Sequence, residues 1–279
     1  MPGTAPHGCL PGAGPEPARE RARFGPVFAA EWGKLIVLRT TLLVPLAGTA
    51  ILVFSAWYFS RHVRIAPGAH DAFAADFDPL AKAFGAEAWA VLTTGLAVVG
   101  ALSLAGEYTA GSVRPLFAAV PDRTRIVLAK AAALGVVGVG AGLAASVSAL
   151  VVSQRELSVN RLDMALTDPV AVRAAAVSAV FPAVAALIGL AVGALLRHEA
   201  AAALGAFAVS TVLPSLFRSD ALALPAAAGR VLPVGAWLAL ANAPAGHPAN
   251  VGLLPWAALV AWPVAAVGCA VWAVRRRDV

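Results

Sequence analysis

Long apolar runs separated by short polar segments dominate this chain. About 20 residues of apolar helix are needed to cross the hydrocarbon core of a bilayer, so each run predicts a membrane-spanning helix. We expect six such helices, at about residues 41–60, 87–105, 131–153, 174–196, 200–217 and 254–274. The pattern predicts an all-α integral membrane protein, in which residues 27–279 form one transmembrane domain.

The residues before the first span fall into two parts. Residues 1–26 are rich in Pro, Gly and Ala, which predicts a disordered cytoplasmic tail. Within 27–39, apolar residues recur at helical spacing, while three charged residues fall off that stripe: Phe28, Trp32, Leu35 and Ile36 against Glu31, Lys34 and Arg39. This arrangement predicts an amphipathic helix in the membrane interface, with Trp32 at headgroup depth. A plain extension of the first span is the alternative.

The positions of Lys and Arg orient the spans. With six spans, both termini lie on the same side of the membrane. Most of the Lys and Arg residues lie on that side, including Arg275, Arg276 and Arg277 after the last span. Because cytoplasmic segments carry the excess of basic residues, both termini are expected to be cytoplasmic. Residues 218–253 are apolar but interrupted by Pro and Gly, which predicts a re-entrant or interfacial segment on the outer side. A seventh span is the alternative, and it would turn the C-terminal arginines outward.

One hydrophilic stretch, residues 106–130, lies between the second and third spans. Its excess of Arg and Lys places it on the cytoplasmic side. A basic loop held between two spans suits contact with a soluble partner, and it suits equally well the anchoring of two helix ends at the lipid headgroups. The charges alone leave both interpretations open.

Composition removes several classes of function. The chain is 60% hydrophobic and 13% charged, where soluble domains have about 25% charged residues. Cys9 and Cys269 make no metal-binding pattern, the five histidines are scattered, and no phosphate-binding loop of the GxxxxGK[ST] type occurs. The chain has no basic patch interleaved with aromatic residues, so the sequence does not predict binding of nucleic acid. We therefore predict no catalytic residue, no metal ligand and no cofactor bound by this chain.

Polar groups within the spans are few. The third, fifth and sixth spans contain no Asp, Glu, Lys or Arg, which disfavours a proton- or ion-coupled transporter. Ser146, Ser148 and Ser178 lie in spans without a His or Lys partner, so we expect their hydroxyls to bond to carbonyls of their own helices. Glycines of the third and fourth spans, including the Gly189–Gly193 pair, predict close helix packing, because small residues let helix backbones approach.

The hydrophilic stretch carries a recognisable pattern. Glu107-Tyr108-Thr109-Ala110-Gly111-Ser112, then Pro115, Val120-Pro121 and Arg123, then Ala129-Lys130-Ala131, resembles the loop after the second span of ABC-2 type transporter permeases. Glu31-Trp32-Gly33-Lys34-Leu35 and Arg39 resemble the amphipathic helix that precedes the first span in that family. Six spans with both ends inside also match. The resemblance covers about residues 27–277, and Ser112 stands where the family often has Thr.

The resemblance implies a function and partners. The chain would be the permease subunit of a transporter in the bacterial cell membrane, expected to export a hydrophobic or amphipathic substrate. ATP and Mg²⁺ would be bound by a separate cytoplasmic ATPase subunit, and two permeases, identical or paralogous, would pair. The stretch would be a coupling helix that contacts the ATPase through Glu107, Tyr108, Gly111, Arg114, Pro121, Arg123 and Lys130. Gly111 would supply backbone freedom, Pro115 and Pro121 would delimit the helix, and Lys130 would mark the start of the third span.

Two other classes of function remain as alternatives. One is a secondary transporter or channel that acts alone. The other is a membrane-bound assembly or sensor subunit with no substrate pathway.

Overall fold

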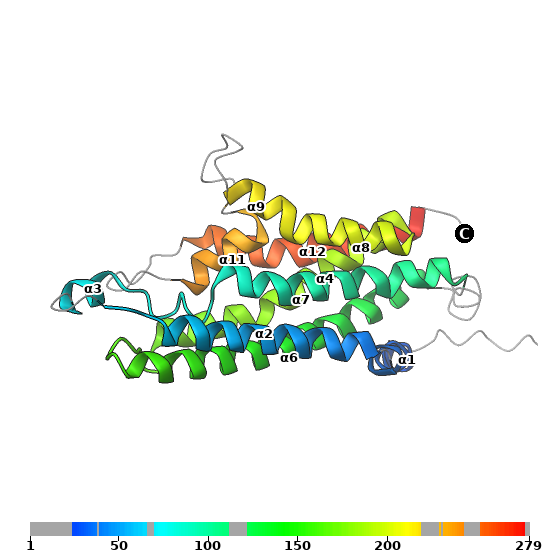
Figure 1. Cartoon of the computed structure of the whole chain (residues 1–279). Helices are drawn as coiled ribbons and strands as arrows, with labels where there is room; N and C mark the ends of the chain where they lie inside the picture. The colour runs from blue at the N-terminus through cyan, green and yellow to red at the C-terminus, as the bar shows by residue number, and fades with distance from the viewer. Residues whose placement is uncertain are drawn as a thin grey trace, which may run out of the picture.

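The fold is a bundle of long helices (Figure 1), taken from a computed structural model that describes residues 24–37, 39–65, 70–111, 122–218, 229, 231–242 and 252–276. The described part of the chain contains helices and connecting segments but no strand. Its helices are α1 (Phe24–Val37), α2 (Arg39–Arg61), α3 (His70–Asp76), α4 (Ala86–Thr109), α6 (Arg123–Ser158), α7 (Pro169–Leu196), α8 (Glu199–Phe207), the π-helix η1 (Ala208–Val212), α9 (Leu213–Arg218), α11 (Pro233–Ala241) and α12 (Leu253–Arg276).

The predicted spans are confirmed as helices. Six helical stretches among the described residues are long and apolar enough to cross a membrane: α2, α4, α6, α7, α12, and Glu199–Leu216 along α8, η1 and α9. The chain is thus an all-helical, multi-pass membrane protein. The third of these helices begins well before its apolar run, at Arg123, because the Asp122 side chain accepts a hydrogen bond from the Arg125 backbone N–H and caps the helix.

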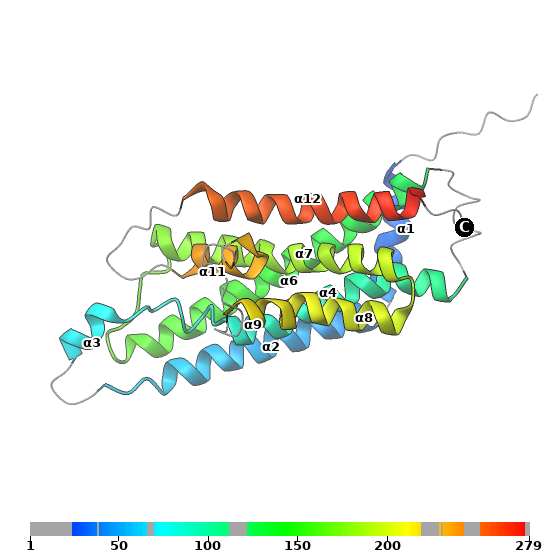
Figure 2. The same ribbon diagram turned by 90° about the horizontal axis from the view of Figure 1, so that it is seen from above.

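Helix α7 lies at the centre of the bundle (Figure 2) and packs against α4, α6, α11 and α12. In the most apolar stretch of α7, 67% of the residues are buried, whereas the corresponding share is 17% for α2 and for Glu199–Leu216. The central position follows from small residues. A side chain at Gly189 or Gly193 would overlap the carbonyls of Ala97 and Ala101 on α4. The close packing predicted from Gly189 and Gly193 is therefore confirmed.

The second face of α7 is packed in the same way. On α6, Gly138 and Gly142 lie against Ala183 and Ala179 of α7, where an added Cβ would overlap backbone atoms. Gly135 and Gly140 of the same helix have no neighbour within 4 Å that an added Cβ would meet. Only half of the glycines in this stretch of α6 therefore serve the contact.

The apolar segment before the last span contains the 9-residue helix α11. Its Trp237 is fully buried, stacks on Phe181 with ring centroids 4.9 Å apart, and donates from Nε1 to Ser178 Oγ at 2.9 Å. Ser146 and Ser148 bond to carbonyls of their own helix as expected, but the expectation for Ser178 overlooked this tryptophan. Because residues 219–228 and 243–251 lie outside the described part, the re-entrant arrangement stays a prediction.

The two ends of the bundle differ. Helix α1 lies across one end, roughly perpendicular to the long helices, and the end of α12 lies at that same end (Figures 1 and 2). At the opposite end, buried Gln154 of α6 joins two connecting segments: its Nε2 donates to Pro79 O at 3.2 Å and its Oε1 accepts from Met164 N at 2.7 Å.

Of the predicted N-terminal tail, residues 1–23 lie outside the described part, and α1 already begins at Phe24.

Candidate functional site

Four charged side chains meet where α1 crosses the ends of α4 and α6. We call Glu31, Lys34, Glu107 and Lys130 the ion cluster. Lys34 Nζ donates to Glu31 Oε1 at 2.6 Å and to Glu107 Oε1 at 2.8 Å. Lys130 Nζ donates to Glu31 Oε2 and, at 3.1 Å, to Glu107 Oε1. Two acids and two bases therefore alternate, and they connect three helices.

The ion cluster is largely shielded from solvent. Side-chain exposure is 3% for Glu31, 4% for Lys130 and 13% for Glu107, whereas Lys34 closes the outer side at 43%. A buried charge must be paired, because an uncompensated one costs several kcal/mol of folding free energy. The alternating arrangement meets this requirement, so the contact between α1 and the bundle depends on all four groups.

The pKa values of Glu31 and Lys34 are shifted in the directions that keep both groups charged. Burial by itself would raise the pKa of the Glu31 carboxyl, but the Lys130 ammonium and then Lys34 outweigh it, so the pKa lies below its ordinary value. For Lys34, burial would lower the pKa, but hydrogen bonds to Glu107 and Glu31 raise it. Both groups are therefore held in their charged forms at neutral pH.

Glu31 is the main correction to the sequence-based expectations. The amphipathic pattern placed it off the apolar stripe, yet the residues that α1 buries are Val27, Glu31 and Leu35, at a spacing of four. Burial of Glu31 is possible because Lys130 faces it from α6, 99 positions away. Lys130, expected to mark the cytoplasmic end of the third span, is buried within α6, which begins at Arg123; where the membrane begins along α6 stays a prediction. Ile36 is 49% exposed and lines one cavity together with Trp32 and Leu35, which agrees with the expected apolar stripe.

Three other predicted site residues, Tyr108, Gly111 and Arg123, lie at or near the ends of α4 and α6 that the ion cluster joins. The guanidinium of Arg197 lies 4.7 Å from the centre of the Tyr108 ring. Gly111 has a φ of +68°, in the left-handed region where glycine is favoured, just after the end of α4. Arg123 donates from Nη1 to Val274 O at 3.5 Å and so ties the start of α6 to the end of α12.

The interfacial residues of α1 and α2 take separate places. Trp32 is half-buried and stacks on Phe28 with centroids 6.1 Å apart, and Arg39 is exposed at the first position of α2. Arg114, Pro115 and Pro121 lie outside the described residues, so their expected roles are predictions only.

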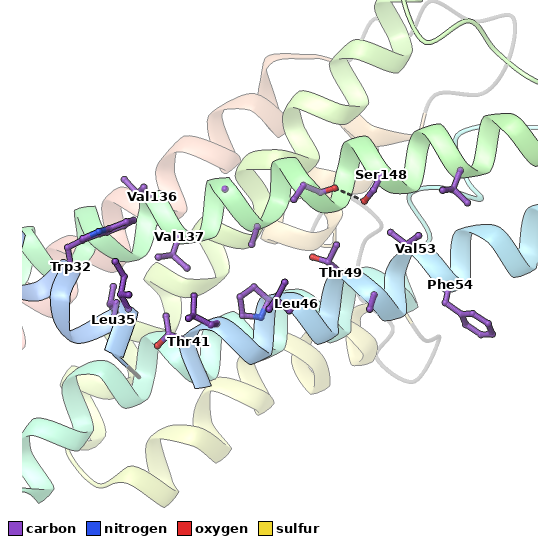
Figure 3. Close-up of a pocket in the computed structure, with 18 of the residues that line it drawn as sticks. Trp32, Leu35, Thr41, Leu46, Thr49, Val53, Phe54, Val136, Val137 and Ser148 are labelled. Carbon is purple, nitrogen blue, oxygen red and sulfur yellow. Dashed lines mark hydrogen bonds between the residues drawn. The ribbon is translucent and has the colours of Figure 1, made fainter. Parts of the chain in front are cut away.

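Two cavities adjoin α1. A cavity of about 670 Å³, which we call the elbow cavity, lies between α1, α2, α4 and the start of α8, with the ion cluster on its lining. On the other side of α2, an open groove of about 1080 Å³ runs between α2 and α6, with Trp32 and Leu35 at one end (Figure 3). Apolar side chains line nearly all of that groove, and Ser148 is satisfied by its own helix, so the groove suits hydrocarbon.

Two functional candidates were missed by reasoning from the sequence. Arg197 and Glu199 border the same end of the bundle, and each sits where α7 passes into α8. Arg197 adopts a φ of +55° as it ends α7. Both had been counted only as charges that orient the membrane helices, and nothing in their spacing pointed to Tyr108 or to the elbow cavity.

The sequence matches no family model and no curated protein.

Proposed function

We propose that this chain is the membrane-spanning permease subunit of an ABC-2 type transporter, driven by ATP that a separate cytoplasmic subunit hydrolyses. The ion cluster is the observation that supports this most. It clamps α1 to the end of α4 and the start of α6, the two helices that flank the segment expected to touch the ATPase. The proposal takes the end of the bundle that carries α1 as the cytoplasmic one.

A clamp of this kind suits the transmission of movement. Paired charges at hydrogen-bond distance hold the three helix ends together, so a push on the segment between Gly111 and Asp122 would move them as one body. Arg123 would pass the same displacement to α12 through the Val274 carbonyl. Rigid-body displacement of helices is an established way to gate a pathway.

The face around α8, η1 and α9 is the candidate surface for a second permease. Thr94 Oγ1 of α4 and Thr211 Oγ1 of η1 lie 2.6 Å apart, beside a cavity of about 770 Å³ that Ser210 and Ser215 also line. The hydroxyls of Ser210 and Ser215 bond to carbonyls of their own helices. The support for a second copy is therefore the low burial of this face: only 17% of the most apolar part of Glu199–Leu216 is buried within one chain. Two copies, identical or paralogous, would enclose the substrate route along this face.

The substrate would be hydrophobic or amphipathic, and the transporter would be an exporter in the bacterial cell membrane. Charged groups are absent from the described mid-portions of the six membrane helices, so a small hydrophilic ion would find no counter-charge there. Lipid-like molecules and drugs of low polarity meet that condition.

Affinity purification from the native membrane in mild detergent tests the proposal. A co-eluting soluble ATPase with a phosphate-binding loop is expected with the native chain and reduced with Arg114→Glu. Arg155→Glu, an exposed arginine on α6 at the opposite end of the bundle, is the matched control and should leave the yield of the ATPase unchanged.

Each other outcome selects an alternative. Transport by the purified chain without ATP or a partner would replace the proposal with a secondary transporter. Loss of a complex on Arg114→Glu, with no ATPase in it and no transport by any variant, would favour an assembly or sensor subunit.

A further inference from the structure

The elbow cavity has an unbalanced charge. Of the acids and bases that line it, Glu31 and Glu107 are matched by Lys34 and Lys130, as the four hydrogen bonds between them require. Glu199 adds a third carboxylate to the lining, and it forms no ion pair with any residue that the structure describes. Among the residues that the structure describes, the lining therefore has three carboxylates and two ammonium groups, an excess of one negative charge.

Glu199 lies where a ligand headgroup could reach it. It is exposed in the first turn of α8, and its Oε1 lies against α4 beside Gly106, 3.2 Å from the position that a Cβ on that glycine would take. The absent side chain at Gly106 leaves the carboxylate accessible from the cavity. A carboxylate at the edge of a cavity attracts an ammonium group by charge and by hydrogen bonds.

The rest of the lining narrows the class of ligand. An ammonium has three N–H donors, and Lys34 uses two of them within the ion cluster, which leaves one for an anion. The described lining contains no aromatic residue, whereas quaternary ammonium groups are usually held by aromatic rings. Val44, Val98 and Leu102 form an apolar wall that suits a hydrocarbon chain. The volume of the elbow cavity, about 670 Å³, lies within the usual range of ligand sites.

We propose that the elbow cavity binds a phospholipid whose headgroup ends in a primary ammonium, as in phosphatidylethanolamine, taken from the leaflet in which α1 lies. Glu199 receives the ammonium, the remaining N–H of Lys34 receives the phosphate, and one acyl chain follows the wall of Val44, Val98 and Leu102. The site needs no ATPase and no second copy, so it stands or falls independently of the transport function.

Native mass spectrometry of the purified chain in detergent tests the site, with equimolar phosphatidylethanolamine, phosphatidylcholine and phosphatidylglycerol added in competition. Phosphatidylethanolamine is expected to be the preferred adduct. Glu199→Gln should lower that preference about threefold, the size expected when a solvent-accessible ion pair is lost. Glu199→Lys should shift the preference to phosphatidylglycerol, since the reversed charge favours the anionic lipid.

The matched control is Asp163→Asn, which removes an exposed carboxylate at the opposite end of the bundle and should leave the preference unchanged. Circular dichroism of each variant confirms that it is folded. Equal binding of the three lipids to the native chain would overturn the proposal, as would a preference that neither Glu199→Gln nor Glu199→Lys alters. If Asp163→Asn lowered the preference for phosphatidylethanolamine as much as Glu199→Gln does, the proposal would also be overturned, because the lipids would then respond to net charge alone.

Discussion

Helices α1 and α7 are both held firmly, but by opposite means. Helix α7 is held by backbone proximity, with Gly189 and Gly193 against α4 and with Ala179 and Ala183 against Gly142 and Gly138 of α6. Helix α1 is held by four charges that meet in the ion cluster. Van der Waals contact between backbones is insensitive to pH and to nearby charge, whereas an ion cluster responds to both. The difference suits a fixed central helix and a peripheral helix whose position can be altered.

The largest expected effect is on the helix held by charge. Lys130→Met leaves the buried Glu31 carboxylate with Lys34 alone, which should lower the free energy of unfolding by about 3 kcal/mol. The measurement is denaturant unfolding of the purified chain in detergent, followed by circular dichroism. Removing both partners together, as Glu31→Gln with Lys130→Met, should restore most of the loss, because no buried charge is then left without its counter-ion. Native-like unfolding of the single variant would mean that the ion cluster does not hold α1.

A smaller effect is expected on the helix held by proximity. Gly189→Ala forces a methyl group into the Ala97 carbonyl and should separate α7 from α4, at a cost of about 2 kcal/mol in unfolding free energy. Gly135→Ala makes the same chemical change on α6, where an added Cβ meets nothing within 4 Å, and it should be neutral or slightly stabilising. The same unfolding assay compares the two. If both variants behaved alike, close backbone contact would not be what positions α7.

The smallest effect is on pH dependence, and it separates the two helices directly. The pKa of Glu31 is lowered from an ordinary value of 4.5, so its contribution to stability is fully present above pH 4.5 and is lost as the pH falls through the lowered pKa. The pKa of Lys34 is raised from 10.5, so its contribution is present below pH 10.5 and is lost as the pH rises through the raised pKa. Between those limits these two groups give no pH dependence.

Unfolding midpoints measured across the acidic range should fall more steeply for the native chain than for the variant with Glu31→Gln and Lys130→Met. Gly189→Ala should shift the midpoints by a constant amount, since no titratable group takes part in its contact. Parallel curves for the native chain and the double variant would contradict the assignment of the acid-sensitive step to Glu31.

The sequence predicted the long helices and part of their packing, because length, hydropathy and the spacing of glycines are local properties. The Gly189–Gly193 pair is an example: its spacing alone places both glycines on one face of α7. Glu31 is the counterexample, since its spacing also placed it within one turn of apolar neighbours but its charge argued for the surface. Only the position of Lys130, on a different helix, decides that Glu31 is buried. Arg197 and Glu199 were missed for the same reason, as their partners lie on other helices.

The separation of Glu31 from its partner has a consequence for the order in which the chain is made. Lys130 is synthesised 99 residues after Glu31, which at about 5–20 residues per second is a delay of roughly 5–20 s. During that interval the residues of α1, α2 and α4 are made, but the Lys130 ammonium of α6 does not yet exist. Until then Glu31 has only Lys34 of its own helix as a partner, so we expect α1 to stay at the membrane surface while the helices it later contacts are made. We therefore expect the docking of α1 to be a late step in biogenesis, even though α1 is the first described helix to be made.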